Sequence, residues 1–418
     1  MARNRVIYQS EALFVGPTTG GISNGDHSQL IRVQDISHDM AATRTDVFEF
    51  GRLAPLDKVM IEPPTVTLDF SYLVTNGGNE EAMGMSISNT TTKTVKWDAG
   101  TAPALISGLI EDGSVSPGEK NYYVVTVPES EDAEGNTSSN DKTYNGFAVV
   151  GFGNAVVSNY SVNGAVGDFP SASVSAEAFN VSYISGTRGA TADSWVTIAA
   201  IPSVKKGAGA LEDGTAALPS PTTGNAPVFA IRPGDITLNF DSSTAGTAGA
   251  AGQLSVGGAV IPTNANEDPD AVVERRGQAE PMHIQNFSID APLTRTALTR
   301  LGSTFPYYRA IDFPLDITLN VSAYLADTET GSLVDLICDD QKRIIDVNMR
   351  VPCTSTSSDT VENPLTICYR LRNAQLTSQN MAATIGDTKT VDLSFQAQYG
   401  GATDTSNGLF VSGRADAS

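Results

Sequence analysis

Apolar and polar residues alternate along two stretches of the chain that lie 251 positions apart. An alternation of period two predicts a β-strand with one apolar face and one polar face. The same kind of strand is therefore expected at both places. The alternating apolar residues are Val66, Leu68, Phe70 and Tyr72 in the first stretch, and Ile317, Leu319, Val321 and Ala323 in the second.

The two strands belong to a longer repeat. Residues 33–74 align with residues 284–325 without a gap, and twelve of the 42 aligned pairs are identical. Unrelated stretches of ordinary composition would share roughly two or three. Two prolines and a glycine are among the identical residues, and these types restrict or widen the backbone conformation. The identical pairs are Gln34/Gln285, Ser37/Ser288, Asp39/Asp290, Thr43/Thr294, Arg44/Arg295, Thr45/Thr296, Gly51/Gly302, Pro55/Pro306, Pro63/Pro314, Thr67/Thr318, Leu68/Leu319 and Ser71/Ser322.

A second repeat follows at an offset of 219 positions. Residues 154–178 align with residues 373–397, with six identical pairs of 25. The two offsets differ by 32 positions, so the first copy carries about that many extra residues between its two blocks. The period is far above the 20–50 residues of a solenoid, which indicates that one whole domain is duplicated.

The expected fold class is mainly β, with two duplicated antiparallel β-sandwich domains, each with a short flanking helix, plus loop-rich insertions. Residues 1–187 are expected to form the first domain, with an acidic insertion at about 77–145. Residues 188–279 are expected to hold connecting strands and Gly/Pro-rich loops. Residues 280–418 are expected to form the second domain and a polar C-terminal tail.

Further elements are predicted from shorter patterns. Short helices are expected at 101–110 and 332–337, and a turn at 76–79. Further strands are expected at 12–15, 32–36, 46–50, 121–127, 147–152, 172–183, 235–240, 344–351 and 365–371.

The chain is strongly acidic, with a net charge of −21 and a sequence pI of about 4.4. Such a balance argues against a protein that grips nucleic-acid phosphates, since that needs clustered Lys and Arg. No run of 18 apolar residues predicts a membrane span. The three cysteines, Cys338, Cys353 and Cys368, fit small buried side chains in a reducing cytoplasm, although a Cys353–Cys368 bridge stays open.

No pattern of catalytic, cofactor-binding or metal-binding residues stands out. The three histidines form no triad, the cysteines lack metal-ligand spacing, and no phosphate-binding glycine motif is present. We therefore expect no enzyme activity, no cofactor and no metal. The repeated Asp39/Asp290 and Asp168/Asp387 could form a glycosidase pair, but repetition favours a turn or cap role.

The repeated Arg44 and Arg295 each lie within a Thr-Arg-Thr motif. Either a salt bridge inside the domain or a contact across a subunit interface would explain an arginine kept in both copies. Both explanations stay open, and Arg44 and Arg295 are the candidate interface residues.

An acidic, Gly/Ala/Ser/Thr-rich, β-rich chain with a duplicated domain and the opening seen in residues 1–17 resembles the tail tube proteins of tailed bacteriophages. The resemblance implies strands that join those of neighbours into a β-barrel around a lumen. Two fused domains imply trimeric rings with pseudo-sixfold symmetry, stacked into a tube. The implied partners are further copies, other tail proteins and passing phage DNA without specific binding, with no membrane. The implied location is the virion tail, after assembly in the host cytoplasm.

A strand that lines a wet lumen needs one polar face. The polar faces of the repeated strands carry no Lys or Arg, so DNA could pass without release of its counterions. An ordinary sandwich with a solvated outer face would show the same alternation. The lumen-facing candidates are Thr67, Asp69, Ser71, Glu177, Thr318, Asn320, Ser322 and Asp392.

Other structural roles also fit this composition. A head decoration, capsid-lattice or neck ring protein of a phage is the main alternative. A carbohydrate-binding or adhesin-like β protein would need exposed aromatic platforms, and the chain has only Trp97 and Trp195. An enzyme is the last choice because no catalytic set is found.

Overall fold

The structure, a computed structural model, describes part of the chain. The described residues are 11–17, 28–62, 64–90, 104–110, 118–126, 147–186, 197–198, 203–204, 211–212, 216–217, 231, 236–241, 254–256, 259–261, 282–301, 306, 308–325, 342–350, 365–383, 388–401 and 404–414.

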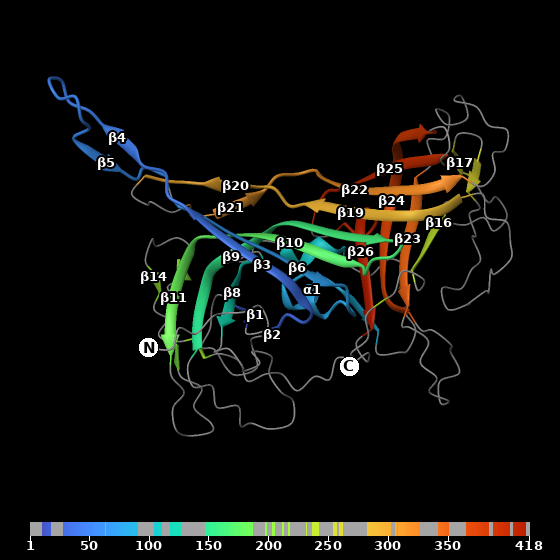
Figure 1. Cartoon of the computed structure of the whole chain (residues 1–418), viewed down its shortest axis with the longest axis horizontal. Coiled ribbons are helices and arrows are strands. Elements are labelled where there is room, and N and C mark those ends of the chain that lie inside the picture. Colours follow the sequence, from blue (N-terminus) through green and yellow to red (C-terminus); the bar gives the residue numbers. More distant parts are fainter. Residues whose placement is uncertain are drawn as a thin grey trace.

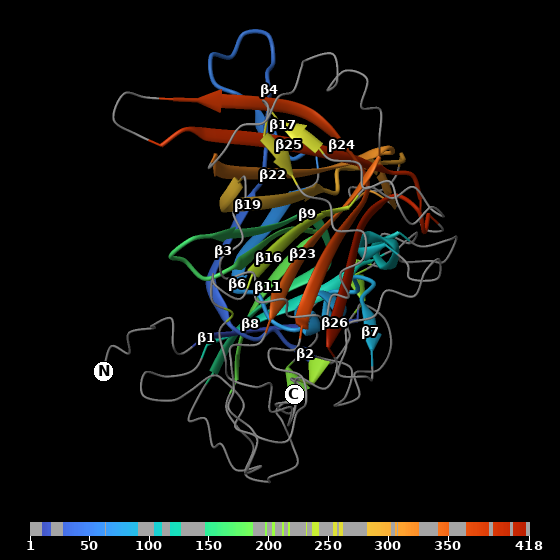
Figure 2. The same cartoon turned by 90° about the vertical axis from the view of Figure 1, so that its right-hand side faces the viewer.

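Eight antiparallel strands form a central sheet to which both copies of the repeat contribute, in the order β24-β25-β22-β19-β9-β10-β6-β3. Figure 2 shows part of this order, from β25 through β22 and β19 to β9. The first copy supplies β3 (Val33–Ala41), β6 (Thr65–Leu73), β10 (Ser171–Ala178) and the second half of β9 (Phe147–Ala165). The second copy supplies β19 (Met282–Pro292), β22 (Leu315–Leu325), β25 (Thr390–Tyr399) and the second half of β24 (Leu365–Ala382).

Each copy adds a smaller sheet on the apolar side of the central one, and Figure 1 shows the strands of the second small sheet running across β19, β22 and β25. The long strands β9 and β24 pass through both sheets of their own copy. The first small sheet holds β1 (Glu11–Pro17), β8 (Lys120–Thr126) and β11 (Asn180–Gly186), with β2 (Ser28–Gln29) at its edge. The second holds β16 (Ile236–Asp241), β23 (Arg343–Arg350) and β26 (Gly408–Arg414), with β7 (Ser88–Thr90) at its edge.

Two hairpins and several short strands complete the described strands. One hairpin joins β4 (Thr45–Val47) to β5 (Asp57–Val59), and its counterpart joins β20 (Arg295–Leu298) to β21 (Tyr308–Ile311). Three short antiparallel pairs lie in the segment between the copies: β12 (Thr197–Ile198) with β15 (Ala216–Ala217), β13 (Ser203–Val204) with β14 (Leu211–Glu212), and β17 (Leu254–Val256) with β18 (Ala259–Ile261).

Matched irregularities show that the two copies share their geometry. The identical Gln34 and Gln285 mark a bulge against the next strand, and the side-chain Nε2 of each donates a 3.1 Å hydrogen bond to a backbone oxygen two residues earlier. A second bulge lies at the aligned Ser158 and Thr377, whose hydroxyls donate to aligned backbone oxygens at 3.1 and 3.0 Å. Bulges of this kind bend the strand and belong to the fold rather than being local defects.

The bend that carries β9 and β24 from one sheet to the other is also matched. Asn154 and Asn373, an identical pair, both have positive φ angles, of 51° and 57°. Asparagine tolerates this left-handed region better than most residues. The repeated asparagine therefore fixes the turn between the two sheets of each copy.

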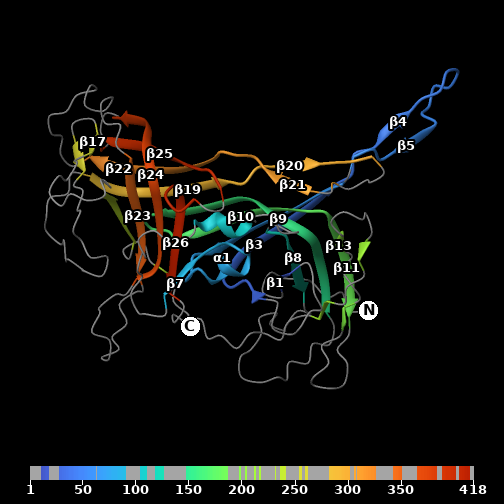
Figure 3. The same ribbon diagram turned by 180° about the vertical axis from the view of Figure 1, so that it is seen from behind.

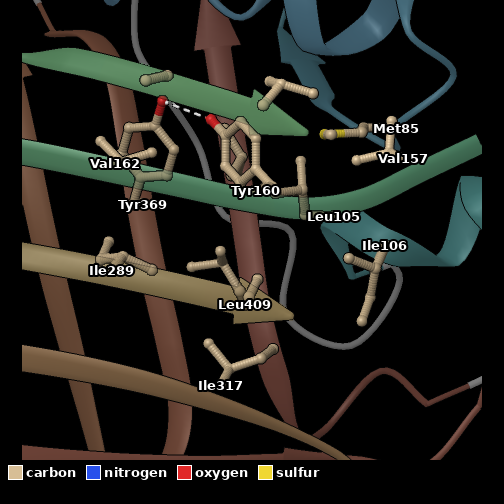
Figure 4. Packing of buried hydrophobic residues seen from close by; sticks show 14 of the residues in the cluster. Met85, Leu105, Ile106, Val157, Tyr160, Val162, Ile289, Ile317, Tyr369 and Leu409 are labelled. Carbon is tan, nitrogen blue, oxygen red and sulfur yellow. Dashed lines mark hydrogen bonds between the residues drawn. The ribbon is translucent and has the colours of Figure 1, made fainter. Parts of the chain in front are cut away.

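One continuous hydrophobic core fills the space between the central sheet and the small sheets. Figure 4 shows Ile289 and Ile317 of the central sheet near Leu409 of β26, with Leu105 and Ile106 close by. These side chains are buried because the alternation places every second residue of the central strands on this side. The core runs without a break from the first copy into the second.

The mainly antiparallel β class expected from the sequence is confirmed. The helix expected at 101–110 is a short 3-10 helix, η2 (Leu105–Leu109), and the one expected at 332–337 lies outside the described residues. The turn expected at 76–79 leads into a helix that the sequence analysis missed, α1 (Gly78–Ala82). The strand expected at 172–183 is divided between β10 and β11.

The segment 188–279 contributes a strand to the second small sheet. Its strand β16 pairs with β23 along Ile236–Asp241, as β1 pairs with β8 in the first copy. The limits of the two domains stay a prediction. Cys338 and Cys353 lie outside the described residues, so a Cys353–Cys368 bridge also stays open, while Cys368 is buried.

Candidate assembly surface

The eight lumen-facing candidates lie on one face of the central sheet, opposite the core. Each alternates with buried neighbours, and none of the eight is itself buried. Thr67 lies opposite Glu177 across β6 and β10, and Ser322 lies opposite Asp392 across β22 and β25. The structure therefore brings the candidates of both copies onto a single polar face. That this face lines a lumen stays a prediction.

One register row of this face crosses all eight strands without a lysine or arginine. Its only charged members are two aspartates, so the row is polar and acidic. In order from β3 to β24 the row is Asp35, Ser71, Ser173, Ser161, Asp290, Thr318, Gln396 and Gln375.

The two copies meet where β9 pairs with β19, and we call this joint the internal seam. Its register runs from Asn286 opposite Ala165 to Pro292 opposite Asn159. On the core side, Gly164 lies opposite Phe287, and a Cβ atom at position 164 would meet the Phe287 ring at 2.4 Å. Glycine at this position therefore leaves room for a large aromatic ring at the seam.

A buried polar cluster lies under the internal seam and ties the copies together. Tyr72 and Tyr160 donate hydrogen bonds to Oε1 of the buried Glu80 at 2.7 and 2.9 Å. Tyr160 also shares a 3.2 Å hydrogen bond with Tyr369 of the second copy, drawn in Figure 4. Burial raises the pKa of Glu80 above its ordinary value of 4.5, and the tyrosine hydrogen bonds only partly offset this effect.

The hairpin β20–β21 of the second copy lies on the first copy beside the seam. Arg295 Nη2 donates to the backbone oxygen of Leu109 at 3.2 Å, and Arg309 Nη1 donates to that of Glu177 at 2.7 Å. The Arg309 guanidinium also lies 3.9 Å from the centre of the Phe179 ring. Burial, together with the nearby charge of Arg309, lowers the pKa of Arg295 to about 10.

The outer edges of the central sheet are the exposed counterparts of the seam strands. β3 is the counterpart of β19 and pairs only with β6 among the described strands. The second half of β24 is the counterpart of the seam half of β9, and within the described residues it pairs only with β25. Met40 of β3 is 55% exposed, whereas its counterpart Ala291 is 1% exposed. The apolar side of β3 is thus solvent-exposed at a position where the pairing of β9 with β19 buries the corresponding residue of β19.

The hairpin β4–β5, which we call the arm, extends away from the body in Figures 1 and 3. Arg44, the counterpart of Arg295, is exposed here. The structure therefore gives the two candidate interface arginines different surroundings. The large apolar side chains exposed in β4, β5, their connection and the two residues after β5 are Val47, Phe48, Phe50, Leu53, Leu56, Val59, Met60 and Ile61.

Sequence reasoning missed the polar residues that complete the face at the seam. Ser161 and Asn163 of β9, and Ser288 and Asp290 of β19, join the polar sides of the two copies. The signal for Ser161 and Asn163 was the alternation of β9, which continues beyond the predicted strand at 147–152. The turn role expected for the repeated aspartates fits Asp168, whose carboxylate accepts from the backbone N–H of Phe169. It is wrong for Asp39 and Asp290, because both lie within paired strands.

No group of three or more potential metal ligands occurs in the described part of the chain. Within the same residues, no helix is long and apolar enough to cross a membrane.

Comparisons with known proteins do not assign this chain to a family. No protein family matches the sequence, and no curated protein matches it. A crystal structure described as that of "Hcp protein" matches at 14% identity, over 43% of this chain and 98% of that chain, with a TM-score of 0.20. At this TM-score the likeness carries no argument about function.

Proposed function

We propose that the chain is a tube-forming structural protein whose copies join edge to edge into rings around a lumen. The more specific form of the proposal is the tail tube of a tailed bacteriophage, with trimeric rings of pseudo-sixfold symmetry that stack in the virion and let DNA pass. The observation that carries the proposal is the internal seam, because it joins two copies of one domain through edges whose counterparts are both exposed.

The two exposed edges, β3 and the second half of β24, could pair with each other in the way that β19 pairs with β9. We applied the register of the internal seam to the aligned residues of these edges. Ile36, Ser37 and Asp39 of one chain then lie opposite Ala383, Ala382 and Asn380, respectively, of a neighbouring chain. Gly164 and Phe287 of the seam correspond to Ala383 and Ile36 at the exposed edges. Isoleucine, which is smaller than phenylalanine, thus faces alanine, which is larger than glycine, so that the combined side-chain volume of the pair stays similar. A head-to-tail contact of this kind generates a ring if its rotation closes.

The stagger of the central sheet is compatible with a closed barrel. The register row starts at Asp35 in β3 and reaches β19 at Asp290. The residue of β19 that aligns with Asp35 is Asn286, so the row has shifted by four residues between the two copies. Four residues across four strands, at about 3.3 Å per residue and 4.8 Å per strand, give a strand tilt of roughly 35°. Closed barrels have strand tilts of about 35–45°. Three chains would then give roughly 24 strands and a barrel about 45 Å across.

The polar face has the properties that a DNA passage needs. Its central row carries aspartate, serine, threonine and glutamine but no cation. Phosphates bind proteins mainly through Lys and Arg, with release of counterions. An acidic wall therefore repels DNA weakly and leaves it free to slide. In this proposal the chain has no catalytic role and works in the virion tail after assembly in the host cytoplasm.

Electron microscopy of the purified, concentrated protein tests the proposal. We expect hollow rings or tubes with apparent sixfold symmetry, each ring built from three chains. Flat lattices or solid particles would contradict the tube and favour a capsid-lattice or decoration role.

A further inference from the structure

The internal seam includes a hairpin as well as a strand pair, and this second part has a counterpart in the arm. β19 leads directly into β20–β21, which lies over the end of β10 in the other copy. Beneath it, Phe179 is only 7% exposed, because the Arg309 guanidinium covers its ring. Ile311, at the end of β21, packs against the core.

The arm is joined to β3 by a connection of the same length, and it carries a cation at each of the two positions where β20–β21 carries one. The alignment of 33–74 with 284–325 has no gap, so β3 leads into β4–β5 as β19 leads into β20–β21. Arg44 aligns with Arg295, Lys58 with Arg309, and Met60 with Ile311. If β3 pairs with the β24 of a neighbour, the arm must therefore fall on the second copy of that neighbour, over the end of its β25.

We propose that the arm β4–β5 is an intersubunit clamp that docks on the second copy of the next chain. Lys58 takes the place of Arg309, and the backbone oxygen of Gln396 in the neighbour takes the place of that of Glu177. Gln398, the counterpart of the covered Phe179, is exposed in the single chain and becomes covered. The clamp rests on the proposed edge-to-edge assembly.

The surface of the arm fits this occupant. Val47 and Val59 are exposed on its strands, and Met60 and Ile61 follow β5. A projecting hairpin with clustered apolar side chains marks an interaction site. Lys58 lies 3.3 Å from Asp46 of the same arm, so its ammonium is already held on the hairpin from which it would donate.

The tip of the arm supplies a matched control. Phe50 is 106% exposed, and its counterpart Leu301 is 103% exposed although β20–β21 is docked. The hairpin tip is thus not part of the contact in the internal seam. We expect Lys58→Glu to weaken association roughly tenfold or more, and Phe50→Ser to change it less than about twofold.

The clamp can be tested in the full chain by photo-crosslinking, with p-benzoylphenylalanine in place of Met60. The control carries the same probe in place of Ile311, where it should react within one chain. We expect the Met60 probe to link to residues 388–401 of another chain. Links to other segments, or none between chains while hollow rings form, would overturn the clamp and leave the proposed tube intact.

The remaining outcomes separate the two proposals. Links to 388–401 in particles that electron microscopy shows to be solid would support the clamp and contradict the tube. A chain that stays monomeric at every concentration, while the Ile311 probe reacts within its own chain, would contradict both.

Discussion

The two hairpins of this protein share a sequence motif and a connection, but one is docked and the other projects. β20–β21 lies against the first copy, and its Arg295 and Arg309 donate to backbone oxygens there. β4–β5 carries Arg44 and Lys58 at the aligned positions, and all residues of its two strands except the half-buried Asp46 are exposed. The same hairpin is therefore covered where its own chain supplies a second copy and exposed where it does not, and in the proposed assembly a neighbouring chain would supply that cover.

The largest contrast is expected between the two repeated arginines. Arg295→Glu places an acid in a desolvated site and should lower the free energy of unfolding by about 3–5 kcal/mol. Arg44→Glu should change it by less than about 0.5 kcal/mol, because the side chain is exposed in the single chain. Urea denaturation of the monomer measures both, and sedimentation velocity should show that Arg44→Glu no longer assembles. Equal losses of stability would contradict the comparison.

The seam glycine and its counterpart should differ in the same way. Gly164→Val should cost about 1–3 kcal/mol of folding stability, because its Cβ would meet the Phe287 ring and force it aside. Ala383→Val should leave the stability of the monomer nearly unchanged and reduce assembly, since in the proposed joint this residue would face Ile36 of the neighbouring chain. Thermal unfolding and light scattering separate the two effects. A loss of monomer stability with Ala383→Val as large as with Gly164→Val would refute the assignment.

Because Glu80 is buried, we expect the free energy of unfolding to depend on pH. Because burial raises the pKa of Glu80, the folded state binds its proton more tightly than the unfolded state. The resulting stabilisation is complete below the ordinary value of 4.5 and is lost as pH rises through the raised pKa. Glu80→Gln keeps an oxygen acceptor for Tyr72 and Tyr160, and should remove this part of the pH dependence.

The measurement is the melting temperature of both proteins from pH 4 upward. The difference between Glu80→Gln and the unmodified protein should grow in favour of the variant as pH rises. A constant difference across the range would mean that Glu80 has the same pKa in the folded and unfolded states.

The smallest effect on stability is expected on the polar face. Ser71→Lys and Ser322→Lys, at an identical pair of the repeat, should change the free energy of unfolding by less than about 0.5 kcal/mol. Assembled tubes of the double variant should retain DNA at low salt and release it at high salt, because lysine binds phosphates. Filter binding of labelled DNA, with Ser71→Thr and Ser322→Thr as the control, measures this. DNA retention by the control tubes would contradict the account of an inert wall.

Sequence alone predicted the parts of this fold that local patterns determine. The alternation in β6 and β22 indicated both strands and their polar faces, because every second side chain must enter the core. The short helix α1 was missed because Gly77 and Gly78 indicate a turn. Its residues are fixed by distant contacts, since the Asn79 side chain exchanges two 2.9 Å hydrogen bonds with the backbone of Ile31.

The seam could not be predicted, because no local signal says which strand edge joins which. β9 and β19 are more than a hundred residues apart, and their pairing depends on the whole fold of both copies. For the same reason the alignment found Arg295 but could not say whether it is buried within the chain or exposed at its surface.

Disulfide trapping tests the central claim, that the internal seam is the template for the joint between chains. Ser37→Cys and Ala382→Cys are introduced together after Cys338, Cys353 and Cys368 are replaced by alanine. Residues directly opposite in an antiparallel pair have Cβ atoms about 4.5–5.5 Å apart, close enough for a disulfide, and diagonal neighbours are further apart. The account predicts chains linked by disulfides under mild oxidation, with little linkage for the slipped pair Ser37→Cys and Asn380→Cys. Equal linkage of both pairs, or none in assembled particles, would contradict it.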